Sequence, residues 1–193
     1  MNNKGGNFYM EKLYAYTMVS RNKDNKGVLG FKQRTKSYLC YESEESKMIE
    51  KFDRFVSDGV HGEKSRLYKS VNARNEEKTK NAFFARVLIE NISVVKYHRA
   101  LVGTAMLVEN RAESKWLFDF DSTDEKRLSK FVDRIAYYGN LNKCDIFVQQ
   151  TPHGFAVVVP HGFDTRKLMD EFADCDITLK RDDLLFVKMA ENV

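Results

Sequence analysis

The chain has 193 residues, of which 42% are hydrophobic and 31% are charged, and its net charge is +4. This length allows one or at most two domains with a substantial core, and the composition is that of an ordinary soluble globular protein. No apolar run approaches the ~18 to 20 residues of a membrane span, and the N-terminus lacks the hydrophobic segment of a signal peptide. Both features predict a cytoplasmic protein without membrane contact. The mild positive charge permits a nucleotide or nucleic-acid partner but does not demand one.

The three cysteines, Cys40, Cys144 and Cys175, form no Cys-x-x-Cys motif. An odd and scattered set predicts reduced thiols and excludes a disulfide framework or a cysteine-based zinc site.

Residues 1–110 are expected to form an α/β portion. Residues 1–8 are polar and contain glycine, so we expect them to be frayed. Hydrophobic periodicity then predicts strands over 12–20, 31–41 and 66–71, and helices over 44–56, from Asn75 onward and over 92–108. The turn over 21–27 is basic; it is either solvated or in contact with phosphate.

Residues 111–193 carry a sharper pattern. Ser122 and Glu125 form a capping-box pair before a helix with apolar residues at i, i+3, i+4 and i+7. The pattern predicts strands over 116–121, 145–150, 155–159, 177–180 and 184–189, and helices over 124–138 and from Asp164. The order β-α-β-β-α-β, with one extra strand at the end, is typical of the ferredoxin-like arrangement. We therefore predict an α+β fold in which a ferredoxin-like (βαββαβ) C-terminal core packs against the N-terminal α/β portion as one compact unit.

The strand over 116–121 ends in two aspartates, Asp119 and Asp121, spaced i, i+2. Side chains alternate along a strand, so the two aspartates share one face while Phe118 and Phe120 fill the other. Neighbouring carboxylates repel each other, and a divalent cation between them commonly relieves that repulsion. Hard oxygen ligands suit Mg²⁺ or Mn²⁺. The alternative is a strand that ends in a solvated Asp-Ser-Thr-Asp turn capping the next helix.

In a ferredoxin-like sheet the aspartate strand lies beside the strand over 155–159. Polar residues on the same side then form one surface, made of Asp119, Asp121, Gln150, Thr151, His153 and either Asp182 or Asp183. Three carboxylates on one sheet face can hold two metal ions for the transfer of a phosphoryl or nucleotidyl group, while basic residues neutralise the triphosphate.

The apolar-Asp-x-Asp strand, the helix after it, and the stretch Thr151-Pro-His-Gly-Phe155 resemble the archaeo-eukaryotic primase superfamily over about residues 110–190. The resemblance implies a ferredoxin-like sheet and a small primase or primase-polymerase of phage or mobile-element type, acting in DNA replication in the host cytoplasm. Its implied partners are nucleotides and single-stranded nucleic acid, with Mg²⁺ or Mn²⁺ as cofactor. The implied catalytic and metal-binding residues are Asp119, Asp121 and, on a later strand, Asp183 or Asp182. Thr151 and His153 belong to the motif's turn and are the expected substrate contacts there.

One position departs from the family pattern. The family has a nucleotide-binding histidine directly after the aromatic residue, and this chain has Ala156. The departure favours a second hypothesis, a non-catalytic nucleotide- or nucleic-acid-binding protein derived from the same fold. The presence of both Asp119 and Asp121 favours the enzyme.

A basic segment over 64–80 surrounds Tyr68 and includes Arg66 and Arg74. If this segment packs beside the sheet, the two arginines are candidate phosphate ligands. The alternative is a solvated basic face.

Other motifs fit less well. Asp119 to Thr123 also matches the Asp-x-Asp-x-Thr signature of haloacid-dehalogenase-type phosphatases, but the chain after Thr123 reads β-β-α-β and not as repeated βα units. The two Pro-His-Gly-Phe segments lack the Ser or Thr that paired-histidine phosphoesterases have two residues after each histidine. As a zinc pair, His153 and His161 lack further ligands at a typical spacing.

Overall fold

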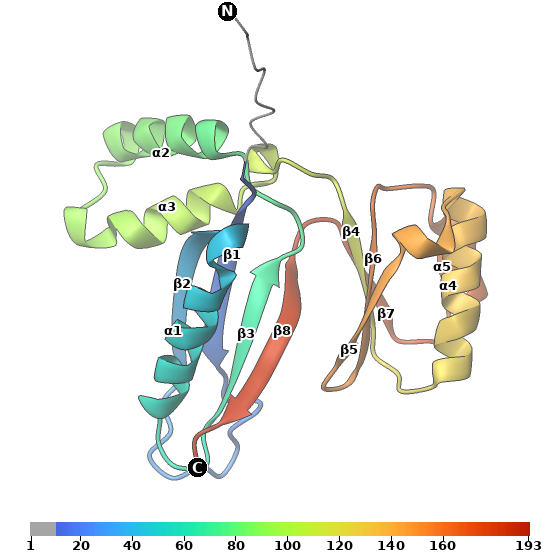
Figure 1. Cartoon of the computed structure of the whole chain (residues 1–193), viewed down its shortest axis with the longest axis horizontal. Coiled ribbons are helices and arrows are strands. Elements are labelled where there is room, and N and C mark those ends of the chain that lie inside the picture. Colours follow the sequence, from blue (N-terminus) through green and yellow to red (C-terminus); the bar gives the residue numbers. More distant parts are fainter. Residues whose placement is uncertain (1–10) are drawn as a thin grey trace, which may run out of the picture.

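The structure is a computed structural model that describes residues 11–193, so the expectation of fraying for residues 1–8 lies outside the described part. The described chain is α+β, with two four-stranded antiparallel sheets and five α-helices (Figure 1). Sheet A has the order β2-β1-β3-β8, with β1 (Leu13–Ser20), β2 (Arg34–Tyr41), β3 (Lys64–Ser70) and β8 (Leu184–Glu191). Sheet B has the order β5-β6-β4-β7, with β4 (Trp116–Phe120), β5 (Phe147–Thr151), β6 (Gly154–Val159) and β7 (Ile177–Lys180).

The helices are α1 (Glu45–Ser57), α2 (Glu76–Glu90), α3 (Tyr97–Ala105), α4 (Glu125–Gly139) and α5 (Arg166–Glu171). Each expected strand and helix is present within a few residues of its predicted bounds. The helix expected over 92–108 is shorter, because 3₁₀ turns at Val94–Lys96 and Val108–Asn110 flank α3. None of the described helices is long and apolar enough to cross a bilayer.

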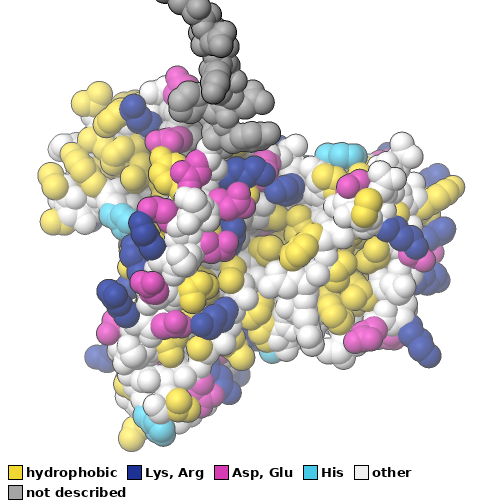
Figure 2. All heavy atoms as spheres, in the orientation of Figure 1, with side chains coloured by type: hydrophobic (Ala, Val, Ile, Leu, Met, Phe, Trp, Pro, Cys, Tyr) yellow, Lys and Arg dark blue, Asp and Glu magenta, His cyan; other side chains and the backbone are white. Residues whose placement is uncertain are grey.

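Sheet A is covered by α1 on one face. Residues of α1 at i, i+4 and i+7 (Met48, Phe52 and Phe55) are buried, and they pack with Tyr16 and Met18 of β1 in one core cluster. This is the stripe that a helix of 3.6 residues per turn presents to a sheet. The helices α2 and α3 lie together at one end of sheet A (Figure 1). Figure 2 shows apolar side chains gathered over this end, where Leu88 and Ile89 are exposed.

Sheet B is covered by α4 and α5 on the face that points away from sheet A (Figure 1). Phe118 and Phe120 are fully buried there against Phe131 and Ile135 of α4, which is the alternation expected for β4. The expected pairing of β4 with β6 is also confirmed, with Asp119 directly opposite Ala156 in antiparallel register.

The opposite face of sheet B looks toward sheet A. Leu117, Ala156 and Val158 form a small buried cluster there with Val71, and Leu185 of β8 packs against it. The final strand, β8, belongs to sheet A and pairs with β3, so the chain crosses from one sheet to the other between β7 and β8. The extra strand predicted at the C-terminus therefore joins the two halves of the molecule.

The predicted capping box of α4 is wrong. The N-cap of α4 is Asp124, whose Oδ1 accepts hydrogen bonds from the backbone N–H groups of Lys126 (3.0 Å) and Arg127 (3.1 Å). Ser122 instead accepts from the backbone N–H of Asp124. An aspartate one residue before the helix satisfies the first-turn donors directly and leaves no role for the predicted capping box. At α5, which begins after Thr165, the side chain of Asp164 accepts a hydrogen bond from the backbone N–H of Arg166 at 3.1 Å.

Candidate active site

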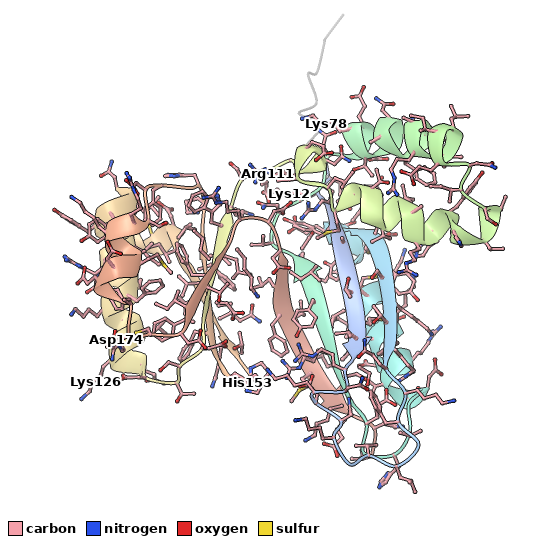
Figure 3. The ribbon with its side chains drawn as sticks, turned by 180° about the vertical axis from the view of Figure 1, so that it is seen from behind. Lys12, Lys78, Arg111, Lys126, His153 and Asp174 are labelled. Atoms are coloured by element: carbon pink, nitrogen blue, oxygen red, sulfur yellow. The ribbon has the colours of Figure 1, made fainter. Side chains whose placement is uncertain are left out.

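A cleft opens between the inner face of sheet B and the edge of sheet A, with a cavity of about 180 Å³. In Figure 3 His153 lies at one end of this space, between the two sheets. The polar and charged lining residues are Arg21, Lys23, Arg66, Tyr68, Asp119, Asp121, Thr151, His153 and Lys180. The structure thus brings together predicted site residues from three separate segments of the chain: Asp119 and Asp121, Thr151 and His153, and Arg66.

The strand β4 delivers both aspartates to the cleft. Because Phe118 and Phe120 are held in the core by α4, the intervening Asp119 must point to the other face, and Asp121 follows on the same side. Ala156, the residue at the family's histidine position, lies next to Asp119 on β6 and also lines the cleft.

The turn between β5 and β6 is held close to the end of β4 by a glycine. A Cβ atom at Gly154 would lie 2.1 Å from the carbonyl oxygen of Phe120, so no other residue fits without moving the backbone. This close approach brings Thr151 and His153 to the same cleft as Asp121. A steric requirement therefore explains why the Thr-Pro-x-Gly stretch has glycine at position 154.

Lys180, at the end of β7, is a cleft residue that the sequence reasoning missed. Its Nζ donates to Asp119 Oδ2 at 2.9 Å and lies 3.5 Å from Asp183 Oδ2. Burial lowers the pKa of Lys180, but the hydrogen bond and negative charge of Asp119, together with Asp183, outweigh burial and raise the pKa above its ordinary value. The ammonium therefore neutralises the carboxylates that were expected to face a metal ion alone.

The two candidates for the third carboxylate have different surroundings. Asp183 reaches the cleft group through Lys180. Asp182 instead accepts two hydrogen bonds from Arg74, at 2.9 and 2.7 Å, and one from Asn72 at 3.0 Å. The side chains of Arg74 and Asp182 are 0% and 6% exposed, so they form a buried ion pair outside the cleft. The structure does not bring Arg74 together with the other predicted substrate contacts.

A backbone contact also links the end of β4 to the residue just before β7. The backbone N–H of Asp121 donates to the carbonyl of Asp176 at 2.9 Å, just before β7 begins. Its proximity in space comes from the β4–β7 pairing, which no local sequence signal reveals.

The basic wall of the cleft comes from sheet A and the β1–β2 loop. Arg66 Nη2 donates to Asp24 Oδ1 at 2.7 Å and lies 3.4 Å from His153 Nε2. Arg21 also donates to Asp24, at 3.0 and 3.2 Å. Burial raises the pKa of Asp24, but the hydrogen bond from Arg21 and the charge of Arg66 outweigh it and hold the pKa below its ordinary value.

Two guanidinium groups thus share one carboxylate, which leaves an excess positive charge at the cleft, and Lys23 adds to it. Arg66 Nε is buried and has no hydrogen-bond partner within residues 11–193. Arg66 itself lines the cavity, which places its guanidinium next to any anionic ligand there.

The donor set fits a hard cation in part. Mg²⁺ usually keeps several waters and takes only one or two protein carboxylates together with substrate phosphate oxygens, and Asp119 with Asp121 meets that requirement. No group of three or more His, Cys, Asp or Glu residues within the described chain is arranged to hold a metal ion. A cation at Asp119 has to compete with Lys180.

Comparisons with protein-family models, with curated proteins and with solved structures gave no match. Function is therefore inferred from the chemistry of the cleft.

Proposed function

We propose that the protein is a primase-like, metal-dependent nucleotidyltransferase of phage or mobile-element type that acts on nucleotides and single-stranded nucleic acid. The observation that carries the proposal is the opposition of charges across the cleft. Asp119 and Asp121 lie on one wall, and Arg66 lies on the other with its Nε unpaired. Carboxylates for cations facing donors for phosphate are the two components that nucleotidyl transfer needs.

Each part of the cleft has a role in this proposal. Asp119 and Asp121, with Asp183 as the further carboxylate, would hold Mg²⁺ or Mn²⁺, which would supply charge stabilisation for the transfer. Arg66 and Lys23 bind and orient the triphosphate. Thr151 and His153, at the rim, contact the substrate from the β5–β6 turn.

The topology of sheet B supports a ferredoxin-like core. The elements β4 to β7 follow the order β-α-β-β-α-β, and the strand order β5-β6-β4-β7 is antiparallel throughout. In this arrangement the first and third strands lie at the centre, which brings the aspartate strand and the strand after the Thr-Pro-His-Gly turn side by side.

The second candidate function is non-catalytic binding of nucleotides or nucleic acid by the same cleft. Two observations favour it. Lys180 already neutralises Asp119, and Ala156 supplies no hydrogen-bonding side chain where the resemblance leads one to expect histidine. Both functions use the basic wall of the cleft. They differ because only nucleotidyl transfer requires the carboxylates of Asp119 and Asp121.

Incorporation of labelled nucleotides on single-stranded DNA with Mn²⁺ separates the two functions. Asp121→Ala is expected to reduce turnover by at least ~10² to 10³, because loss of a ligand removes transition-state stabilisation. Asp133→Ala is the matched control, since Asp133 is an exposed carboxylate on α4. Binding of the strand without incorporation, equal in wild type and Asp121→Ala, would establish the non-catalytic function.

A further inference from the structure

Sheet A has a second face, opposite to α1, that continues from the cleft. Residues directly opposite each other on antiparallel strands share a face. The register therefore traces one row across all four strands, Ser37, Thr17, Tyr68 and Phe186. A second row runs Thr35, Val19 and Arg66. We call these seven residues the open face.

The open face is polar and aromatic and remains accessible. Thr35 is exposed, and the four residues of the first row are partly exposed. The hydroxyl groups of Thr17 and Ser37 are 3.1 Å apart, and the rings of Tyr68 and Phe186 pack edge to face with centroids 6.0 Å apart. A face of this kind offers hydroxyl groups at one end and aromatic rings at the other.

A hollow lies between the β1–β2 end of the open face and α3, with a cavity of about 630 Å³. Thr17, Thr35 and Ser37 line it from the sheet and Arg99 from α3. Leu184 of β8 lines both this hollow and the cleft, so the two spaces adjoin along sheet A. Figure 3 views the molecule from behind, with α3 above the strands of sheet A.

The charge of this path is positive. Arg99 is exposed and makes no ion pair within the described residues, and the hollow has no acidic side chain among its lining residues. At the cleft end, Lys23 is exposed and Arg66 lines the cavity. Asp24, the acid of the β1–β2 loop in contact with Arg66, is already shared by two arginines. Basic groups thus flank the open face at both ends.

We propose that the open face of sheet A binds single-stranded nucleic acid and leads it into the cleft. Proteins that bind single strands without a fixed sequence combine basic groups along the backbone with aromatic rings on which bases stack, as Arg99, Tyr68 and Phe186 would. Unpaired bases are required, because Tyr68 and Phe186 lie in the angle between the two sheets. The proposal rests on the proposed function only in its claim that the nucleic acid is led into the cleft. Binding of the nucleic acid itself depends on the open face.

The test is fluorescence anisotropy of a labelled oligothymidine titrated with protein at several salt concentrations. Arg99→Gln is expected to weaken binding several-fold and to reduce the salt slope by about 0.7, the value for one phosphate contact on a single strand. Thr35→Glu, which adds a negative charge at an exposed position of the open face, is expected to weaken binding at least ~5-fold. The matched controls, Lys167→Gln and Ser129→Glu, change exposed residues on α5 and α4 and are expected to bind as wild type does.

Three results would overturn the proposal. The first is equal binding by wild type, Arg99→Gln and Thr35→Glu. The second is equal weakening by the control variants, which would indicate a nonspecific effect of net charge. The third is a dimer in light scattering that Thr35→Glu dissociates while oligonucleotide binding is unchanged, which would make the open face a self-association surface.

Failure of the proposed function gives a different result. Binding that depends on Arg99 and Thr35 without any nucleotide incorporation leaves the open face established and removes the enzymatic activity. The opposite result is incorporation that depends on Asp121 together with binding that Arg99→Gln and Thr35→Glu leave unchanged. It would support the enzymatic activity and overturn the open face as the binding surface.

Discussion

At the scale of single residues, Lys180 changes the electrostatic environment of the pair Asp119 and Asp121. Two carboxylates on one strand face were expected to repel each other and to need a cation. Lys180 supplies a positive charge from β7, with Nζ 2.9 Å from Asp119. Asp119 and Lys180 are each 32% exposed, so the ion pair contributes at most ~1 kcal/mol. Asp119 therefore has a positively charged partner of its own, and a divalent cation at Asp119 must compete with the ammonium.

Removing that ammonium should strengthen cation binding. In Lys180→Met, we expect Mn²⁺ to bind about fivefold more tightly, which corresponds to the ~1 kcal/mol of the lost competing pair. Millimolar Mn²⁺ should accordingly raise the Tm of Lys180→Met more than that of wild type, because ligand binding to the folded state stabilises it. Asp119→Asn should show the smallest shift.

Lys180→Arg is the control that keeps the positive charge and should respond to Mn²⁺ as wild type does. Equal Tm shifts in wild type, Lys180→Met and Asp119→Asn would show that Asp119 is not a cation ligand.

At the scale of elements, the segment between α3 and β4 is held by one carboxylate. Glu113 accepts hydrogen bonds from Lys12 and Lys115, both at 2.8 Å, and from the backbone N–H of Ala73 at 3.1 Å. Burial raises the pKa of Glu113, but these three donors outweigh it and lower the pKa to about 2. One side chain thereby ties the start of β1, the segment after β3 and the approach to β4.

This pKa predicts a loss of stability in acid. The folded pKa lies below the unfolded value of about 4.5, so the stabilisation is complete above that value and is lost as pH falls toward 2. Glu113 is 19% exposed, and the contribution at neutral pH is about 3 kcal/mol.

Urea unfolding of wild type and Glu113→Gln at pH 7 and pH 3 measures this contribution of Glu113 to the free energy of unfolding. The variant should be less stable than wild type at pH 7 and closer to it at pH 3. A stability difference that does not change between the two pH values would contradict the assignment.

At the scale of the whole molecule, the crossing from sheet B to sheet A is fastened by a buried ion pair. Asp182 lies in the turn between β7 and β8, and Arg74 lies between β3 and α2. Their two hydrogen bonds, at 2.7 and 2.9 Å, join the crossing to the N-terminal half of the chain. This connection is one of the contacts that hold the two sheets together, along with the apolar cluster around Val71 and Leu117.

Breaking the pair from one side should be costly. Arg74→Met leaves Asp182 buried without its cation, and we expect a loss of about 3 to 5 kcal/mol in the free energy of unfolding. The double variant Arg74→Met/Asp182→Leu should recover much of that loss, because the pair is then replaced by apolar groups. Denaturant titrations of the two single variants and the double variant give the coupling; additive losses would show that the residues act independently.

Local features were predictable from the sequence because they depend on neighbouring residues. The alternation of Phe118, Asp119 and Phe120 follows from strand geometry, and the helices α1 and α4 follow from their apolar stripes. The βα pattern also predicted that β4 and β6 are neighbours. The cap of α4 was missed because several adjacent polar residues can cap a helix, and only the backbone conformation selects one.

Only the tertiary structure decided which charges meet. Asp119 and Lys180 are 61 residues apart, and Arg74 and Asp182 are 108 apart, so no local pattern distinguishes Asp182 from Asp183 or pairs Lys180 with the aspartates. The sequence alone determined that Asp119 and Asp121 share a strand face. The arrangement of the two sheets determined what faces them, because an ion pair forms wherever packing brings opposite charges within reach, at any separation along the chain.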